Sequence, residues 1–215
     1  MGGRRQKQER RKMKTISPQN SSRARETKTD FKSIRLTPLD ESDIDAICVW
    51  QNTPNIRDLT MGSRFPVQKD AARDWLKSIR EQNGKSRIVF AIKNKSTLVG
   101  VISLHGIDHF QRKALIGIYV GNAREQNGGV GSIATIILLD YAFNGLDLRR
   151  VSLEVLSINN NAIRLYEKLG FVREGVKRED YFLDGKCIDT HVYGILRDEF
   201  DNSLTVDTNR LIYSI

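Results

Sequence analysis

One segment of the chain has the composition of an anion-binding loop: it reads Gln126, Asn127, Gly128, Gly129, Val130, Gly131, Ser132. The loop separates an apolar, strand-like run over residues 114–120 from a helix-like run that continues to Phe143. Glycine lets a backbone turn tightly and approach a ligand closely, because it has no Cβ. Where a helix begins, free backbone N–H groups and the helix dipole both favour an anion. The segment predicts a pyrophosphate cradle, although an ordinary glycine-rich turn has the same composition.

Two kinds of apolar periodicity surround this loop. Strand-like segments occupy residues 34–36, 88–92, 98–104, 114–120, 151–156, 171–176, 181–183 and 187–196. Helical periodicity begins after Asp40 and stops at Pro54, and it recurs over residues 71–79, 130–143 and 160–169. Several strands follow one another without an intervening helix. This order indicates a mixed α/β fold with antiparallel neighbours rather than a strict βαβ alternation.

Length and composition limit the class of protein. The 215 residues allow one substantial core, and we expect a domain over residues 33–200, with a tail over 1–32 and an extension over 201–215. No run approaches the roughly 18 apolar residues of a membrane span, and the N-terminus lacks an apolar signal-peptide core. Cys48 and Cys187 lie far apart without metal-ligand spacing, so we interpret them as reduced packing residues. We expect a soluble, cytoplasmic protein without membrane contact.

The positive charge is concentrated at the N-terminus. Residues 1–32 carry eleven Lys and Arg against three Asp and Glu, which accounts for +8 of the formal charge of +9. A basic tail can hold RNA, a ribosome or another polyanion through phosphate contacts. The composition favours the simpler interpretation of a solvated, disordered extension, or of residues upstream of a start at Met13.

A second motif accompanies the glycine loop. It reads Asn159-Asn160-Asn161-Ala162-Ile163-Arg164-Leu165-Tyr166-Glu167-Lys168-Leu169-Gly170-Phe171. This segment and the pattern Gln126-x-x-Gly129-x-Gly131 stand about 30 residues apart, and in this order they resemble the GNAT superfamily of acetyl-CoA-dependent N-acetyltransferases. The likeness spans residues 34–200 and is nearest to the branch of ribosomal-protein alanine, spermidine and amino-sugar-nucleotide acetyltransferases. It implies an α/β (α+β) fold: a central, mostly antiparallel twisted sheet of about seven strands, flanked by four helices and splayed between strands 4 and 5.

The resemblance implies where acetyl-CoA lies, as a co-substrate and without a metal. The cleft would open between the strands that end at Val120 and Leu156. The backbone of Ile118, Tyr119 and Val120 would pair with the pantetheine arm, and N–H groups of residues 126–132 would hold the pyrophosphate. Asn159 would order the cleft or contact the cofactor, and it also suits a helix N-cap.

The implied reaction needs a neutral amine. An alkyl amine with a pKa near 10.4 is neutral in only about one molecule in 2,500 at pH 7, a deficit of roughly 4.6 kcal/mol. An N-terminal α-amine, with a pKa near 8, asks much less. The site must therefore desolvate the amine or pass its proton to a carboxylate, an imidazole or a water chain.

Two residues are candidates for acid and base. Tyr166 matches the family's tyrosine and would protonate the leaving thiolate, although the stripe of Ala162, Leu165, Tyr166 and Leu169 would also suit a core residue. Glu154 precedes Tyr166 by twelve residues, a spacing seen in some protein N-terminal acetyltransferases, and it is the candidate base. A surface or structural role for Glu154 and a water-mediated base both stay open.

The early helices cover the acceptor in this fold. The resemblance therefore makes Trp50, Arg57, Met61 and Phe65 candidates for the acceptor pocket, with core packing as the alternative for Trp50. His105, Asp108 and His109 are close in sequence but fall in the expected turn between strands, so we expect no metal site there.

The sequence thus predicts transfer of acetyl from acetyl-CoA to a primary amine by direct attack in a ternary complex. The acceptor stays open among an amino-sugar nucleotide, a polyamine and a protein N-terminus. We expect a monomer or a homodimer. The alternative is a non-catalytic protein that binds acyl-CoA and uses its basic tail to dock on RNA or a ribosome.

Overall fold

The computed structural model describes residues 33–62 and 64–201. The predictions for the basic tail over residues 1–32, and for all but the first residue of the extension over residues 201–215, lie outside this part.

Within the described residues seven strands form one sheet, which confirms the predicted number and the mostly antiparallel pairing. The strands are β1 (Ile34–Pro38), β2 (Arg87–Asn94), β3 (Thr97–Asp108), β4 (Lys113–Val120), β5 (Arg150–Leu156), β6 (Val172–Leu183) and β7 (Lys186–Leu196). Their spatial order is β1-β2-β3-β4-β5-β7-β6. The β4–β5 pair is parallel and every other pair is antiparallel.

Five α-helices flank the sheet in the described residues, one more than predicted. They are α1 (Ile44–Gln51), α2 (Pro54–Leu59), α3 (Lys69–Gln82), α4 (Val130–Asp140) and α5 (Asn160–Lys168). The additional helix is α2, and Pro54 occupies its first turn. Proline lacks an N–H, which is no loss at that position, and its fixed φ suits a helix start. Pro54 therefore begins a helix as well as limiting the one before it.

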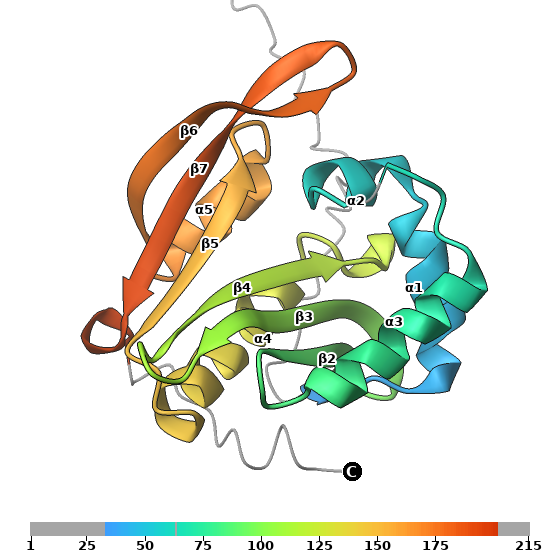
Figure 1. Ribbon diagram of the computed structural model, residues 1–215, viewed down its shortest axis with the longest axis horizontal. Helices are drawn as coiled ribbons and strands as arrows, with labels where there is room; N and C mark the ends of the chain where they lie inside the picture. The colour runs from blue at the N-terminus through green and yellow to red at the C-terminus, as the bar shows by residue number, and fades with distance from the viewer. Residues whose placement is uncertain (1–32, 63, 202–215) are drawn as a thin grey trace, which may run out of the picture.

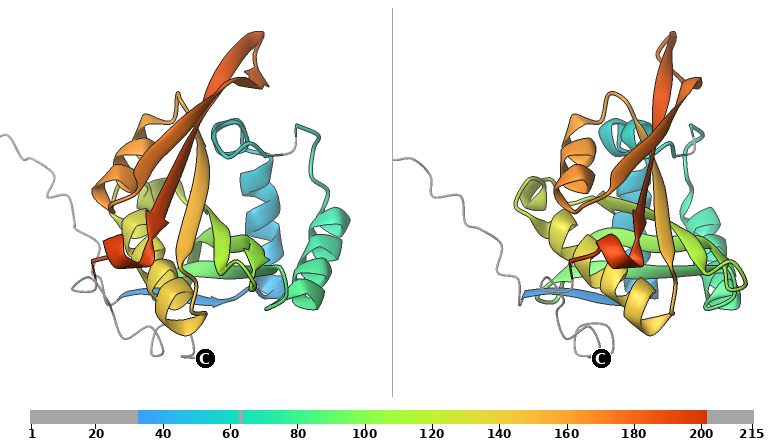
Figure 2. Two further views of the ribbon diagram at one scale, coloured as in Figure 1. Left: turned by 60° about the vertical axis from the view of Figure 1, so that its left-hand side comes forward. Right: turned by 90° about the vertical axis from the view of Figure 1, so that its left-hand side faces the viewer.

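The helices cover the sheet in two layers (Figures 1 and 2). α1 and α3 pack on one face, where Ile47 and Leu76 are buried with Val89 and Val101 of the sheet. α4 and α5 pack on the other face in a larger core that includes Ile102 and Leu104. Residues on a strand alternate between faces. Neighbouring residues of β2, β3 and β4 therefore contribute to two different cores.

The sheet opens between β4 and β5, as predicted. The parallel pairing covers only residues 113–115 of β4 and 150–152 of β5. Beyond Leu115 the two strands diverge, while β4 remains paired with β3 as far as Val120. In Figure 1 the β5–β7–β6 half of the sheet leans away from the β1–β4 half. The divergence leaves the β5-facing side of β4 without a strand partner.

The strand β6 is longer than predicted. Residues 171–176 and 181–183 were expected as separate strands, but β6 is continuous from Val172 to Leu183. Register shifts between Lys177 and Tyr181 absorb the extra residues, and Glu179 adopts a φ of 54° there. Bulges of this kind let a strand continue through residues that pair poorly.

An ion pair links the strands on either side of β7. Arg150 of β5 donates to Glu174 of β6 at 2.6 Å. A Cβ at Gly194 of β7 would lie 2.7 Å from the Glu174 carboxylate and 2.8 Å from the guanidinium. The glycine therefore leaves the room that the pair occupies.

Candidate active site

A cleft of about 1140 Å³ passes through the opening between β4 and β5. Its lining includes Ser103, His105 and Gly117, which share the sheet face covered by α1 and α3. It also includes Ile118 and Val120, which pack against the core on the α4 and α5 face. The cleft therefore draws its walls from both faces of the sheet. We call the first part the acceptor half and the second part the donor half.

The glycine loop forms one end of the donor half. Gln126, Asn127, Gly129, Gly131 and Ser132 line the cleft. Gly129 is the N-cap of α4 and has a φ of 92°, a conformation that L side chains rarely adopt. The N–H groups of the first helical turn have no partner within a helix. These N–H groups lie at the positive end of the helix dipole, so the loop can hold an anion.

Two contacts hold the loop against its neighbours. The Gln126 side-chain amide donates to the Val120 carbonyl at 2.8 Å, which connects the loop to the end of β4. A Cβ on Gly131 would lie 3.1 Å from a methyl carbon of Leu165, so glycine lets α4 and α5 approach closely. Of the other predicted loop residues, Val130 is buried in the core and Gly128 is not part of the cleft lining.

Two basic residues on α5, which were not among the predicted site residues, also line the donor half. They are Arg164 and Lys168, and Arg164 donates to Asn161 at 3.1 Å. Residues spaced by four lie on the same face of a helix, and this spacing was the signal in the sequence that could have identified the pair. Cations beside an anion-binding loop suit a ligand with several phosphate groups.

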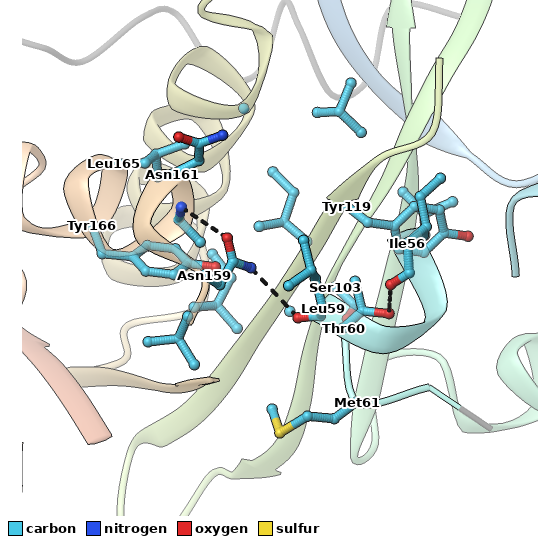
Figure 3. A pocket seen from close by; sticks show the side chains of 18 of the residues that line it. Ile56, Leu59, Thr60, Met61, Ser103, Tyr119, Asn159, Asn161, Leu165 and Tyr166 are labelled. Atoms are coloured by element: carbon cyan, nitrogen blue, oxygen red, sulfur yellow. Dashed lines mark hydrogen bonds between the residues drawn. The ribbon is translucent and has the colours of Figure 1, made fainter. Parts of the chain in front are cut away.

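Tyr166 is both a core residue and a cleft residue. The side chain is 6% exposed and packs edge-on against Phe171, with ring centroids 5.6 Å apart. The ring also lines the cleft and points into it from α5 (Figure 3). Burial raises the pKa of Tyr166 to about 12. The hydroxyl therefore keeps its proton at neutral pH and can donate a hydrogen bond.

Asn159 lies between two parts of the cleft. Its Oδ1 accepts from the Ala162 backbone N–H at 3.2 Å, which caps α5. Its Nδ2 donates to the Leu59 carbonyl at the end of α2, at 3.5 Å. Figure 3 shows both hydrogen bonds, with Tyr166 on one side and Thr60 on the other. The cap is in place, and the same side chain contacts the helix that covers the acceptor half.

Glu154 lines the acceptor half from β5. The alternation along β5 places Glu154 on the face of Ser152, which pairs with Leu115. One of its oxygens accepts from Lys177 Nζ of β6 at 2.6 Å, and this bond raises the pKa of Lys177.

His105 faces the same space, although it was predicted to lie in a turn. The strand β3 extends to Asp108, so His105 is within the sheet, paired with Arg87 of β2 and Leu115 of β4. Burial lowers the pKa of His105, the Arg87 charge lowers it further, and Glu154 opposes the shift. Alternation of Val101, Ser103 and His105 was the signal that would have placed the imidazole in the cleft.

The four residues proposed for the acceptor pocket have different positions. Met61 lines the cleft. Trp50, Arg57 and Phe65 are not part of its lining. Trp50 packs over Gly121 and edge-on against Tyr119, with ring centroids 6.3 Å apart. Arg57 pairs with Asp58 at 2.8 Å, and Phe65 is 83% exposed. Asn55, Ile56 and Leu59 of α2 and the residue that caps it, Thr60, line the cleft in their place.

Residues 33–62 and 64–201 contain neither a metal-binding cluster nor a membrane-spanning helix. Within these ranges no group of three or more His, Cys, Asp or Glu side chains could hold a metal ion. No helix in the same ranges is long and apolar enough to cross a membrane. The cytoplasmic location stays a prediction.

Comparison with known proteins identifies the family. The family model described as acetyltransferase (GNAT) domain matches residues 33–172. The chain is 29% identical over 175 residues to the "Putative ribosomal N-acetyltransferase YdaF" of Bacillus subtilis (strain 168), covering 79% of this chain and 93% of that protein. It is also 29% identical over 171 residues to the spermidine N(1)-acetyltransferase of Vibrio cholerae serotype O1, covering 79% and 96%.

A solved structure has the same arrangement of elements. The crystal structure of spermidine N-acetyltransferase from Vibrio cholerae in complex with CoA and spermine matches with a TM-score of 0.73 and 25% identity. The match covers 78% of this chain and 98% of that one. These findings support an N-acetyltransferase that uses acetyl-CoA, which agrees with a cleft that offers an anion cradle on one side of β4.

Proposed function

The chain belongs to the GNAT acetyltransferase family, and we propose that it transfers acetyl from acetyl-CoA to the α-amine of a polypeptide N-terminus. The observation that carries the proposal is the divergence of β4 and β5 after residues 113–115 and 150–152. It joins an anion-binding half and an amine-accessible half into one cleft, so two substrates can meet at β4. This arrangement supports direct attack in a ternary complex.

The donor half has the groups that acetyl-CoA needs. The first-turn N–H groups of α4 suit the pyrophosphate, and Arg164 and Lys168 add positive charge beside them. Apart from the Val120 carbonyl, which accepts from Gln126, the free side of β4 at Ile118, Tyr119 and Val120 offers backbone groups to the amides of the pantetheine arm. Once bound there, acetyl-CoA supplies the activated acetyl group. Asn159 would keep this half connected to α2 through Leu59.

We assign the leaving-group role to Tyr166. With a pKa of about 12, the tyrosine is a weaker acid than an alkyl thiol, whose pKa is about 8.5. Full proton transfer to a free thiolate would be uphill by about 3.5 units, or about 5 kcal/mol. Tyr166 therefore acts by donating a hydrogen bond to the sulfur. When the sulfur finally takes that proton, the attacking amine supplies another proton to the Tyr166 oxygen.

Charge separates the three acceptor classes. Among the described residues that line the cleft, the carboxylates are Glu125 and Glu154, and Glu154 already accepts a hydrogen bond from Lys177. Glu125 lies on the donor side, where it accepts from Asn94. The acceptor half therefore does not offer unpaired carboxylates for the several ammonium groups of a polyamine.

Of the cations near the acceptor half, Arg57 and Arg64 are engaged, whereas Arg87 lines the cleft with no ion pair within residues 33–62 and 64–201. Arg57 pairs with Asp58, and Arg64 pairs with Asp184 and donates to the Phe182 carbonyl. A nucleotide-linked amino sugar would need such cations for its phosphates. A polypeptide α-amine needs neither arrangement, and its pKa near 8 leaves roughly one molecule in ten neutral at pH 7.

The test is release of CoA from acetyl-CoA across three acceptors: a short peptide with a free N-terminus, spermidine, and a nucleotide-linked amino sugar. We expect the largest kcat/KM with the peptide. Turnover of spermidine at an equal or higher kcat/KM would contradict the assignment of acceptor. No turnover with any amine, combined with binding of CoA in calorimetry, would favour the non-catalytic alternative. Light scattering on the same sample tests the predicted monomer or homodimer.

A further inference from the structure

We propose that His105 is the group that accepts the proton of the incoming amine, and that Glu154 faces it to stabilise the imidazolium. This inference rests on the proposed acetyl transfer. It replaces Glu154 by His105 as the base, and it makes Glu154 a positioning residue.

The backbone places the imidazole where an amine would enter. His105 lies on the acceptor face of β3, next to a register shift between His105 and Asp108. Across from it on β4, a Cβ at Gly117 would lie 3.5 Å from His105 Cε1 and 3.5 Å from Ser103 Oγ. Because Gly117 has no side chain, the imidazole edge borders open cleft where β4 and β5 diverge.

The ring nitrogens are available to exchange a proton. In residues 33–62 and 64–201, no hydrogen bond involves the His105 ring. By contrast, the His109 ring nitrogen contacts the Gly84 carbonyl at 3.1 Å in the turn beyond. An imidazole without a fixed partner can accept a proton from a ligand at either nitrogen.

Burial and the charge of Arg87 favour the neutral imidazole until an amine arrives. Burial lowers the pKa of His105, and Arg87, which is its partner on β2, lowers it further. On the opposite side, Glu154 of β5 raises it and is itself paired with Lys177 of β6. On β4 the facing residues are Leu115 and Gly117, which do not titrate. His105 is therefore mainly unprotonated at pH 7, and a carboxylate lies near enough to stabilise its charged form.

The proton balance is complete with groups already described. His105 takes one proton from the ammonium, and the neutral nitrogen forms the C–N bond to the acetyl carbon as the C–S bond breaks. The nitrogen loses a second proton, which reaches the sulfur by way of the Tyr166 hydroxyl. His105 then returns its proton to water, and N-acetyl peptide and CoA are the products.

The pH dependence of kcat/KM for the peptide tests this role. In the wild-type protein we expect a plateau that extends below the amine pKa, near 8, and breaks below pH 6.5 where His105 gains a proton. In His105→Gln, kcat/KM should fall tenfold per pH unit below about 8, because only the fraction of already neutral amine reacts. The two proteins should diverge as the pH falls below about 8 and converge near pH 9.

A matched control is His109→Gln, which changes a histidine four positions along the chain and outside the cleft lining. It should keep the wild-type profile. A constant ratio between wild type and His105→Gln at all pH values would overturn the inference, because a structural loss does not depend on amine ionisation. A single break near pH 8 in the wild-type profile would overturn it without any variant. If wild type releases no CoA with any amine, the proposed function fails first.

Discussion

Replacement of Tyr166 by Phe removes one hydroxyl from a buried ring and leaves its packing in place. The ring contact with Phe171, at 5.6 Å between centroids, does not involve the oxygen. With a pKa of about 12, the hydroxyl is a hydrogen-bond donor at every pH at which the enzyme would be assayed. Loss of one donor aimed at charge that develops in a transition state costs on the order of 10²–10³ in kcat. We therefore expect Tyr166→Phe to lower kcat about 100-fold.

The assay follows free thiol released from acetyl-CoA with saturating peptide. The KM for acetyl-CoA and the thermal midpoint should stay close to wild type, since the ring and the binding loop are unchanged. Tyr193→Phe is the matched control, because Tyr193 is 1% exposed and its hydroxyl donates to Glu167 at 2.9 Å, outside the cleft lining. It should lose about 1 kcal/mol of stability and no activity. A Tyr166→Phe enzyme with kcat within twofold of wild type would refute the assigned role.

Three further substitutions test the scaffold. Gly121→Ala would place a Cβ 1.9 Å from the Trp50 ring, so it should lower the free energy of unfolding in denaturant by about 1–3 kcal/mol. The loss should be much smaller in a Trp50→Leu background. Equal losses in both backgrounds would contradict the contact. Gly129→Ala strains a φ of +92° and should raise the calorimetric Kd for CoA about tenfold, whereas Gly84→Ala, with a φ of +75° away from the cleft, should leave it unchanged. Glu174→Gln removes a carboxylate whose pKa is lowered by its hydrogen bond to arginine, so the native carboxylate stabilises the fold above about pH 4.5 and loses that effect as pH falls. The stability difference in Glu174→Gln should be below about 1 kcal/mol at pH 7 and close toward pH 3, and an equal difference at both pH values would contradict it.

Local patterns predicted much of the fold. Alternation and apolar runs identified the strands, and Gly170 after residues 160–169 agrees with the observed end of α5. The insertion of β7 between β5 and β6 could not be obtained in this way, because strand order depends on contacts between residues far apart in sequence. Pro54 was interpreted as a stop signal, since a proline that ends one helix and starts the next has the same local appearance.

The site was predicted unevenly for a similar reason. The glycine loop and the residues of α5 carry their roles in contiguous sequence, so the cleft lining includes most of them. The direction of a side chain on a sheet depends on the strand's length and register. His105 was predicted to lie in a turn because the strand was expected to end at Leu104, the residue before it. The strand β3 in fact continues to Asp108. Trp50 was proposed for the pocket, and its ring instead lies over Gly121, whose role only the packing reveals.

The opening in the sheet has a consequence for how such a scaffold can diversify. The groups suited to the acetyl donor come from β4, α4 and α5, whereas α2, β2 and β3 supply much of the other wall. We therefore expect substitutions at Asn55, Thr60 or Met61 to change the choice of amine while the residues suited to the nucleotide stay the same. A fold that transfers acetyl from a thioester can in this way acquire a different amine acceptor when a few side chains change on one short helix and the residues next to it.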